Sequence, residues 1–405
     1  MLDLDDRLDE LKQLGLYRRT RMVSGPQGPR VVLDGRPVLV LCSGNSLGLA
    51  DHPRVREAAA DAAMRWGVGA GAARMASGTM TLHRRLEERL AGFTGADAAV
   101  LFGSGTLANL GAIPALARKG EVVFHDELAH PSIVDGCRLS GADVFAYRHA
   151  DPEHLAWGLQ QSDGRGALIA TDGVFGLDGD VAPLEEIVDL AHHYNVRVLV
   201  DEAQAIGTLG PGGRGAVAEA GLDEEVDVVT GSLGKALGSY GGFACCDHVT
   251  ARYLSNSART LLHSTALPPV AVAAAMAALE LLEEQPRRVE KLLDNAESLR
   301  DELAREGFEV AGSSTHVVPL LIGAAEPTAR IVEYALEQGV FCEAAQPPAT
   351  PDAARLRLAV MASHTRAELR GAAAVLARAA LRAGVRPGAG GPVAVAQFDE
   401  LPRAA

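Results

Sequence analysis

A lysine among glycines and an acid at the end of an apolar run are the residues best suited to covalent chemistry. Lys235 lies in GSLGKALGSYGG, where glycines let the backbone approach a ligand and the amine could act as a nucleophile. Asp201 ends the run VRVLVD, and ligands of open α/β sheets bind at the carboxyl ends of strands. Taken singly, Lys235 could equally be a solvated loop charge and Asp201 a helix cap.

Two stretches have the features of a phosphate site. FGSGTLAN places Ser104, Gly105 and Thr106 after an apolar run and at the start of a predicted helix, where free backbone amides attract anions. Ser232 adds a hydroxyl beside the glycines around Lys235. The second stretch is not a Walker A loop, because alanine stands where Ser or Thr must follow the lysine.

Two further segments could bind or orient a substrate. His130 lies in DELAHPSIVDG at another predicted junction of strand and helix, where a histidine is more often structural than catalytic. Arg355 and Arg357 alternate in ARLRLAV, so both project from one face of a strand. One of them could bind a carboxylate through two hydrogen bonds, and the ordinary alternative is a surface ion pair.

Together these residues form the set that a pyridoxal phosphate (PLP) enzyme needs. Lys235 would form the Schiff base, and Asp201 would keep the pyridine nitrogen protonated so that the ring accepts electrons. His130 would stack on the ring, and Arg357 would hold the carboxylate of an amino acid substrate. The phosphate would be held by Ser104, Gly105, Thr106 and Ser232.

Short apolar runs alternate with helical patterns over most of the chain, which predicts an α/β fold with a mostly parallel sheet covered on both faces. The expected strands are 98–102, 121–124, 143–147, 167–171, 196–200, 226–230 and 242–246. The expected helices among them are 53–66, 81–93, 106–118, 131–140, 183–194 and 248–260. A helix over 3–20 and a hairpin precede this region, and a long helix over 269–305 follows it.

These elements suggest four segments along the chain. We expect an N-terminal helix and hairpin arm over 1–45 and a large ligand-binding domain over 46–285. A smaller C-terminal α+β domain follows over 286–383. The stretch 384–405 is rich in Gly, Pro and Ala, which predicts a disordered tail.

Composition excludes several classes of protein. The 405 residues carry a net charge of −14, which argues against binding to nucleic acid or to anionic membranes. The five cysteines are scattered, no apolar run is long enough to span a membrane, and the start lacks a signal-peptide pattern, so we expect a cytoplasmic protein. GNSLG at 44–48 fits a nucleophile elbow, but only one hairpin precedes it, which disfavours a hydrolase.

The ordered motifs resemble one family, the α-oxoamine synthases, which are PLP enzymes of fold type I. The matching stretches include GLYRR, GSGTLAN, HPSIVDG, GVFGLDGDVAPL, VDEAQAIGTLGPGGRG, GSLGKALGSYGG, HSTALPP and ARLRLAV. The resemblance implies a homodimer with shared active sites, in which Ser264 and Thr265 reach the phosphate bound by the other subunit. The residues that it places at the substrate are Arg18, Asn45, His130 and Arg357.

The resemblance also implies a reaction, because this family joins an amino acid to an acyl thioester with loss of CO2. It is greatest to the members that act in biotin biosynthesis, which favours L-alanine and pimeloyl-CoA. Glycine with acetyl-CoA, another acyl group, and an acyl carrier protein as donor remain open. Two further classes share the fold: a PLP aminotransferase, and a non-catalytic subunit, which the retention of Lys235 disfavours.

The chain departs from the family pattern close to the expected cofactor. Gln204 stands where the family usually has a histidine that contacts the 3′ oxygen of PLP, and a glutamine can donate a hydrogen bond but cannot carry charge. Gly176 stands in place of a serine near the same oxygen. Ser232 replaces a threonine and keeps the hydroxyl, and His263 replaces an aromatic residue. Because these changes occur together, the substrate pair is the least determined part of the prediction.

Overall fold

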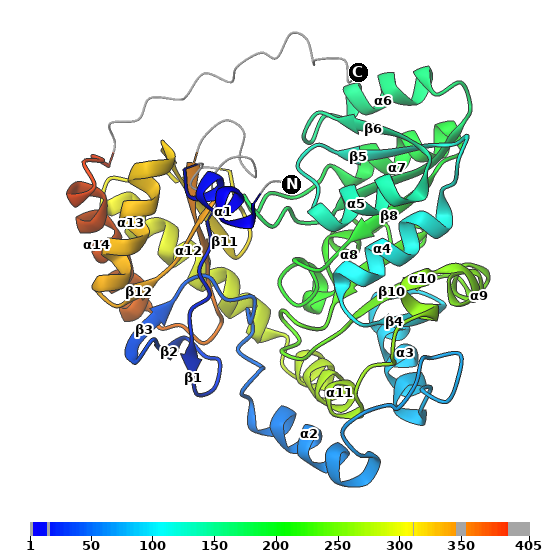
Figure 1. Ribbon diagram of the computed structural model, residues 1–405, viewed down its shortest axis with the longest axis horizontal. Helices are drawn as coiled ribbons and strands as arrows, with labels where there is room; N and C mark the ends of the chain where they lie inside the picture. The colour runs from blue at the N-terminus through cyan, green and yellow to red at the C-terminus, as the bar shows by residue number, and fades with distance from the viewer. Residues whose placement is uncertain (1–2, 14–16, 311, 346–353, 388–405) are drawn as a thin grey trace.

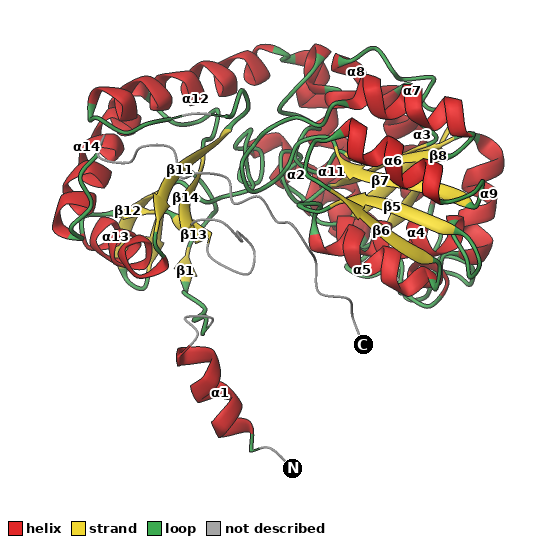
Figure 2. Ribbon diagram, turned by 90° about the horizontal axis from the view of Figure 1, so that it is seen from above, coloured by secondary structure: helices red, strands yellow, loops and turns green. Residues whose placement is uncertain are grey.

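The structure of the chain, a computed structural model, describes residues 3–13, 17–310, 312–345 and 354–387. It has two lobes, a larger one around a seven-stranded sheet and a smaller one around two short sheets (Figures 1 and 2). Most of the expected tail, from residue 388 on, lies outside the described residues. Among those described, no helix is both long and apolar enough to cross a membrane.

The sheet of the larger lobe has the strand order β4-β10-β9-β8-β7-β5-β6. β10 is antiparallel to both of its neighbours, and the pairs from β9 to β6 are parallel. All seven expected strands are present: β4 Ala98–Phe102, β5 Val122–Asp126, β6 Asp143–Tyr147, β7 Gly166–Asp172, β8 Arg197–Asp201, β9 Val228–Ser232 and β10 Gly242–Cys246. β5 and β10 are buried along their whole length, as expected for strands covered on both faces.

Helices cover both faces of this sheet. On one face Ile113 of α4 and Ile133 of α5 pack against Val123 of β5, and on the other Leu155 of α6 and Ile187 of α7 pack in a second cluster. The helices of this lobe are α2 Pro53–Trp66, α3 Thr81–Thr94, α4 Gly105–Leu116, α5 Pro131–Ser140, α6 Pro152–Gln161, α7 Leu184–Tyr194, α8 Ala216–Glu219, α9 His248–Ser257, α10 Arg259–Leu262 and α11 Pro269–Glu284. A 3-10 turn, η1, spans Pro211–Gly213.

The smaller lobe packs three helices on the antiparallel sheet β11-β14-β13. Its elements are α12 Arg287–Arg305, β11 Val317–Gly323, α13 Ala325–Glu337, β12 Val340–Phe341, β13 Glu343–Ala345, β14 Ala354–Ala359 and α14 Arg366–Arg382. One hydrophobic core joins the lobes, since Leu282 of α11, Leu292 of α12 and Leu356 of β14 belong to the same buried cluster. This shared core holds β14 in place relative to the large sheet.

The N-terminal hairpin forms a sheet with the C-terminal part of the chain. The first elements are α1 Leu4–Gln13, β1 Val23–Ser24, β2 Arg30–Leu33 and β3 Arg36–Val40. Asp34 and Gly35 form the expected tight turn, with φ of 47° and 82°. β3 pairs in parallel with β12, which completes the four-stranded sheet β1-β2-β3-β12. Figure 2 shows α1 standing away from both lobes.

Several local expectations differ from the structure. The helix expected over 248–260 is divided into α9 and α10 at Ala258, whose ψ of 105° is not helical. The helix expected over 269–305 is two helices, α11 and α12, because Pro286 has no N–H and its ring clashes with the preceding turn. The helix expected over 3–20 ends at Gln13, and residues 17–20 are not helical. Helix α6 was not expected, although Asp151 and Pro152 are an N-cap and a first-turn proline of the usual kind.

Candidate active site

Asp201 lies at the carboxyl end of β8, where the sequence predicts it, and its carboxylate is buried and fixed by two donors. Asn109 Nδ2, from α4, donates to Asp201 Oδ2 at 2.6 Å, and the backbone N–H of Ala203 donates to Oδ1 at 2.8 Å. Asn109 is itself held, since its Oδ1 accepts from Thr230 Oγ1 at 2.7 Å. The buried side-chain amide of Asn109 therefore connects α4, whose first turn holds the predicted phosphate residues, to the carboxylate of Asp201.

His130 belongs to the same network. Asn109 Nδ2 also donates to Ser132 Oγ at 2.9 Å, and Ser132 Oγ lies 2.7 Å from His130 Nδ1. The backbone N–H of Ser132 donates to that ring nitrogen as well, so Nδ1 is an acceptor and the ring proton is on Nε2. Burial of the ring, together with the positive charge of Lys235, lowers the pKa of His130, while Asp201 opposes the shift. The result is a neutral imidazole with fixed orientation.

A second buried acid lies beside Asp201. Asp172 ends β7, is paired in register with Asp201 on β8, and accepts the backbone N–H of His130 at 2.8 Å. Burial and the nearby negative charge of Asp201 raise the pKa of Asp172 well above that of an ordinary aspartate. Asp172 therefore binds a proton more readily than an exposed aspartate does.

Lys235 faces these acids from the loop after β9. Burial lowers the pKa of its amine, Arg357 lowers it further, and Asp201 and Asp172 oppose the shift. No hydrogen bond joins Lys235 Nζ to any described residue. The amine is consequently closer to its neutral, nucleophilic form than an exposed lysine would be, and it has no competing partner.

The predicted phosphate residues meet at the start of α4. Ser104 is the N-cap, and its hydroxyl accepts the N–H of Leu107 at 3.1 Å, so Gly105 and Thr106 form the first turn. A β-carbon on Gly105 would come 3.3 Å from Gly231 O and from Ser232 Cβ, which shows how closely the end of β9 approaches this turn. Helix amides, hydroxyls and a missing side chain together suit a phosphate group.

The two arginines of β14, Arg355 and Arg357, make different contacts. Arg355 forms an ion pair with Asp178, whereas Arg357 Nε donates to the backbone carbonyl of Gly176 and its guanidinium lies 3.8 Å from Glu343. Asp178 and Gly176 both lie in the loop after β7. The two arginines therefore project from the same face of β14, as their alternation predicts. Arg357 therefore reaches the large lobe, and its Nη2 has no partner among the described residues, while Nη1 lies near Glu343.

The remaining predicted residues are spread more widely. Asn45 is buried beside Gly44, which packs on the Lys235 side chain, and its Nδ2 has no partner among the described residues. Ser264 Oγ lies 3.9 Å from the position of a β-carbon on Gly103, next to the phosphate turn of its own chain. Thr265 is exposed and forms a β-bridge with residue 73. Arg18 is exposed after α1, and none of the contacts described joins it to the other predicted residues.

Three functional residues escaped prediction from the sequence. Asn109 lies inside the quoted stretch GSGTLAN, but its partners come from distant strands. Ser132 follows His130 closely, and only the fold shows that it accepts from Asn109. Asp172 could have been found by the signal that revealed Asp201, since both acids end an apolar run.

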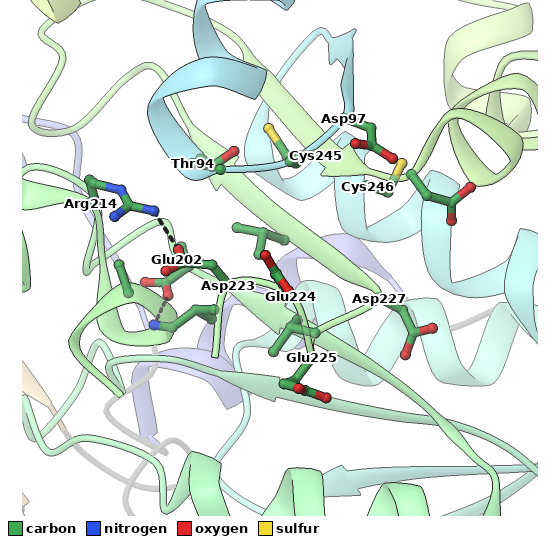
Figure 3. A pocket seen from close by; sticks show the side chains of 17 residues that line it. Thr94, Asp97, Glu202, Arg214, Asp223, Glu224, Glu225, Asp227, Cys245 and Cys246 are labelled. Carbon is green, nitrogen blue, oxygen red and sulfur yellow. Dashed lines mark hydrogen bonds and ion pairs between the residues drawn. The ribbon is translucent and has the colours of Figure 1, made fainter. Parts of the chain in front are cut away.

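A cavity of about 380 Å³ elsewhere in the large lobe is not this site (Figure 3). Seven of its 17 lining residues are acidic, and the lining includes neither Lys235 nor Asp201. Its most buried acid, Glu202, accepts the backbone N–H groups of Ala216 and Val217, and Arg214 pairs with Asp223 at 2.6 Å. These contacts hold the segment around η1 and α8 in place.

The residues around Lys235 fit PLP. A half-buried amine with no hydrogen bond to the described residues matches the aldehyde, and a buried acid with fixed orientation matches the pyridine nitrogen. A neutral histidine matches the ring, and a helix N-terminus with close backbone approach matches the phosphate. Within the described residues no cluster of side chains could hold a metal ion.

Comparisons with known proteins agree with this chemistry. The model of the aminotransferase class I and II family matches residues 36–376. Similar curated proteins include the 8-amino-7-oxononanoate synthases of Citrifermentans bemidjiense, 45% identical over 94% of this chain and 98% of the relative, and of Geobacter sulfurreducens, 45% identical over 93% and 98%.

Solved structures share the fold over nearly the whole chain. The serine palmitoyltransferase of S. paucimobilis, with a PLP–myriocin aldimine bound, is 31% identical, with a TM-score of 0.89 over 94% of this chain and 97% of that one. The chain therefore belongs to the aminotransferase class I and II family, and it has the fold of the fold-type-I PLP transferases. Within that family it is an α-oxoamine synthase, a PLP-dependent acyltransferase similar to the 8-amino-7-oxononanoate synthases.

Proposed function

We propose that the protein condenses L-alanine with pimeloyl-CoA and releases CO2 and CoA, giving 8-amino-7-oxononanoate for biotin biosynthesis. The observation that carries the proposal is the hydrogen bond by which Arg357, from the smaller lobe, reaches the carbonyl of Gly176 in the large lobe, where its charge also acts on the amine of Lys235. This contact supports a role for Arg357 in binding a substrate carboxylate near the proposed nucleophile. The proposed product is the one in the name of relatives about 45% identical over nearly their full length, and the substrate pair follows from the family resemblance.

Each group has a defined task in that reaction. PLP, when bound, supplies a conjugated cation that stabilises negative charge on the α-carbon of the amino acid. Asp201 would hold the proton on the pyridine nitrogen, and the neutral His130 would pack against the ring. Lys235, as a free amine, takes the α-proton and returns one after decarboxylation. Arg357 and the buried Nδ2 of Asn45 bind the substrate carboxylate.

We further propose that the protein works as a homodimer in the cytoplasm. Ser264 lies beside the phosphate turn of its own chain without entering it, and Thr265 is exposed. A second copy packed across this region could therefore bring its own pair of hydroxyls to the phosphate. Sedimentation should show a dimer, and a monomer with full activity would contradict this part of the proposal.

A thiol-release assay over a matrix of amino acids and acyl-CoAs tests the reaction. The expected result is CoA release that requires both L-alanine and pimeloyl-CoA and that falls to background in Lys235→Ala. Release with glycine and acetyl-CoA instead would identify another α-oxoamine synthase. Pyruvate formed from alanine without any thioester, with conversion of PLP to its amine form, would identify an aminotransferase. Turnover retained in Lys235→Ala would refute the mechanism.

A further inference from the structure

The loop after β7 has partners in both lobes. Its segment LDGD, residues 177–180, carries two aspartates. Asp178 forms an ion pair with Arg355 of β14, in the smaller lobe. Asp180 Oδ2 lies 2.9 Å from Nε2 of His149, which follows β6 in the large lobe. The segment therefore connects the two lobes on the side where Arg357 enters the site.

Gly179, between the two aspartates, adds a second contact with the smaller lobe. Its carbonyl oxygen accepts hydrogen bonds from Thr315 Oγ1 at 2.8 Å and from Ser313 Oγ at 3.2 Å, both in the segment before β11. Its φ of 73° lies in the left-handed region, and a β-carbon there would come 2.7 Å from Val317 O. Glycine is therefore required where the loop passes against the backbone of the smaller lobe.

The large lobe fixes the other side of the same loop. The backbone N–H of Phe175 donates to Asp180 O at 2.9 Å, and the buried ring of Phe175 belongs to a core cluster of the large lobe. His149 packs edge-on against that ring at 4.5 Å, and its Nδ1 lies 2.9 Å from Asp126 Oδ1. Because the loop is held in this way, its contacts with the smaller lobe determine the position of β14 rather than that of the loop.

The ion pair and the contact of the substrate arginine are parallel links between the same two segments. Arg355 and Arg357 lie two residues apart on one face of β14, and their partners Asp178 and Gly176 lie two residues apart in the loop. The side chains of Arg355 and Asp178 are only 16% and 21% exposed, so solvent screens this pair less than a surface pair. A change at the ion pair would thus alter the spacing between β14 and the loop at the next link, which orients Arg357.

We propose that Asp178 and Arg355 are positioning residues for Arg357. Their ion pair, together with the hydroxyl of Thr315 on Gly179 O, sets the separation between β14 and the loop after β7. That separation places the guanidinium of Arg357 for the carboxylate of the amino acid, and Arg355 itself does not bind the substrate. The assignment rests on the proposed function, because it takes Arg357 as the group that binds the carboxylate.

A titration of the full-length protein loaded with PLP tests this assignment. L-alanine is added without any thioester, and its binding is followed by the change in the visible PLP band. Asp178→Ala should raise the dissociation constant of L-alanine at least about fivefold, because Arg357 loses its alignment. Simple electrostatics predicts the opposite sign, since the variant removes a negative charge near the carboxylate. L-alaninamide has no carboxylate, so its dissociation constant should change by less than about twofold.

A double-mutant cycle and a matched control identify the pair. Arg355→Met keeps the length of the side chain without its charge, and in that background Asp178→Ala should have a further effect of less than about twofold. Asp223→Asn removes the carboxylate of another partly buried ion pair, with Arg214, whose contacts lie within the large lobe, and it should leave L-alanine binding unchanged. The PLP dissociation constant should stay within about twofold in every variant, which also shows that the variants are folded.

The possible results separate this assignment from the proposed reaction. Tighter binding of L-alanine to Asp178→Ala would show that Arg355 binds the carboxylate itself and would overturn the assignment. Equal effects on L-alanine and L-alaninamide, or no effect on either, would also overturn it. If pimeloyl-CoA supports no thiol release, the proposed substrate pair fails, and the titrations, made with glycine if glycine alone shifts the band, still decide on the ion pair. A wild-type band that responds to neither amino acid would overturn both.

Discussion

Asn109 is the residue whose replacement tests the site network most directly. Asn109→Ala removes the donor to the charged Asp201 and the acceptor of the Thr230 hydroxyl, and both groups are buried. A buried polar group left without its partner costs about 1–3 kcal/mol, with more for a charged one. The expected loss in the free energy of unfolding is therefore about 3–5 kcal/mol, measured by urea denaturation at matched protein concentration.

A graded series makes this prediction sharper. Thr230→Val removes only the neutral bond to Asn109 and should cost about 1–2 kcal/mol. The matched control is Asn256→Ala, because Asn256 is exposed and donates a single bond to a backbone carbonyl, so its loss should be within about 0.5 kcal/mol. Asn109→Ala should also raise the dissociation constant of PLP about tenfold, since Asp201 loses its fixed orientation. If Asn109→Ala lowered the free energy of unfolding no more than the Asn256→Ala control does, the hydrogen bonds of Asn109 to Asp201 and Thr230 would not stabilise the fold, and the prediction would be refuted.

Three further outcomes are expected. Burial opposes protonation of His149, but the hydrogen-bonded carboxylates of Asp126 and Asp180, each 2.9 Å away, raise its pKa to about 10. His149→Gln should therefore have a lower free energy of unfolding than the wild type at neutral pH. This difference should be fully present below about pH 6.5 and should disappear as the pH rises through about 10. Urea midpoints of the two proteins that differ by the same amount from about pH 6 to about pH 10.5 would contradict this. Gly242→Ala places a β-carbon 2.3 Å from the carbonyl of Ser104, so the PLP dissociation constant, measured by absorbance, should rise at least about tenfold. Addition of PLP at 100 times its dissociation constant should raise the free energy of unfolding by about 2.7 kcal/mol, and an unchanged melting temperature would argue against a preformed site.

The sequence predicts the large sheet well because most of its strands are short apolar runs that are buried, as β5 and β10 are along their whole length. The edge strand β6 is the exception, since three of its five residues are exposed. The long helix shows the limit of the same reasoning, since the apolar pattern continues across Pro286 while the backbone cannot. The pairing of β3 with β12 joins segments with no local signal in common, so no pattern within either one could reveal it.

The candidate site likewise contains some residues that local sequence signals reveal and others that only the fold reveals. Lys235, Asp201 and the turn at Ser104 carry local signals, namely glycines, a strand end and a helix start. The role of Asn109 depends on which side chains lie across the sheet from it, and the fold alone supplies that information. The ion pair of Asp178 with Arg355 likewise joins a loop of the large lobe to a strand of the smaller one and cannot be read from either residue type.

The pairing of the N-terminal hairpin with β12 has a consequence for the order of events during synthesis. Arg30, next to the hairpin's start, contacts Glu368, which is 338 positions later, so the hairpin cannot find its partner until almost the whole chain has left the ribosome. The strands from 98 to 246 can pair much earlier, because their contacts span shorter separations. We expect nascent chains to acquire Lys235 and the phosphate turn first and Arg357 last, so that the growing polypeptide can retain the vitamin-derived cofactor before it can select an amino acid.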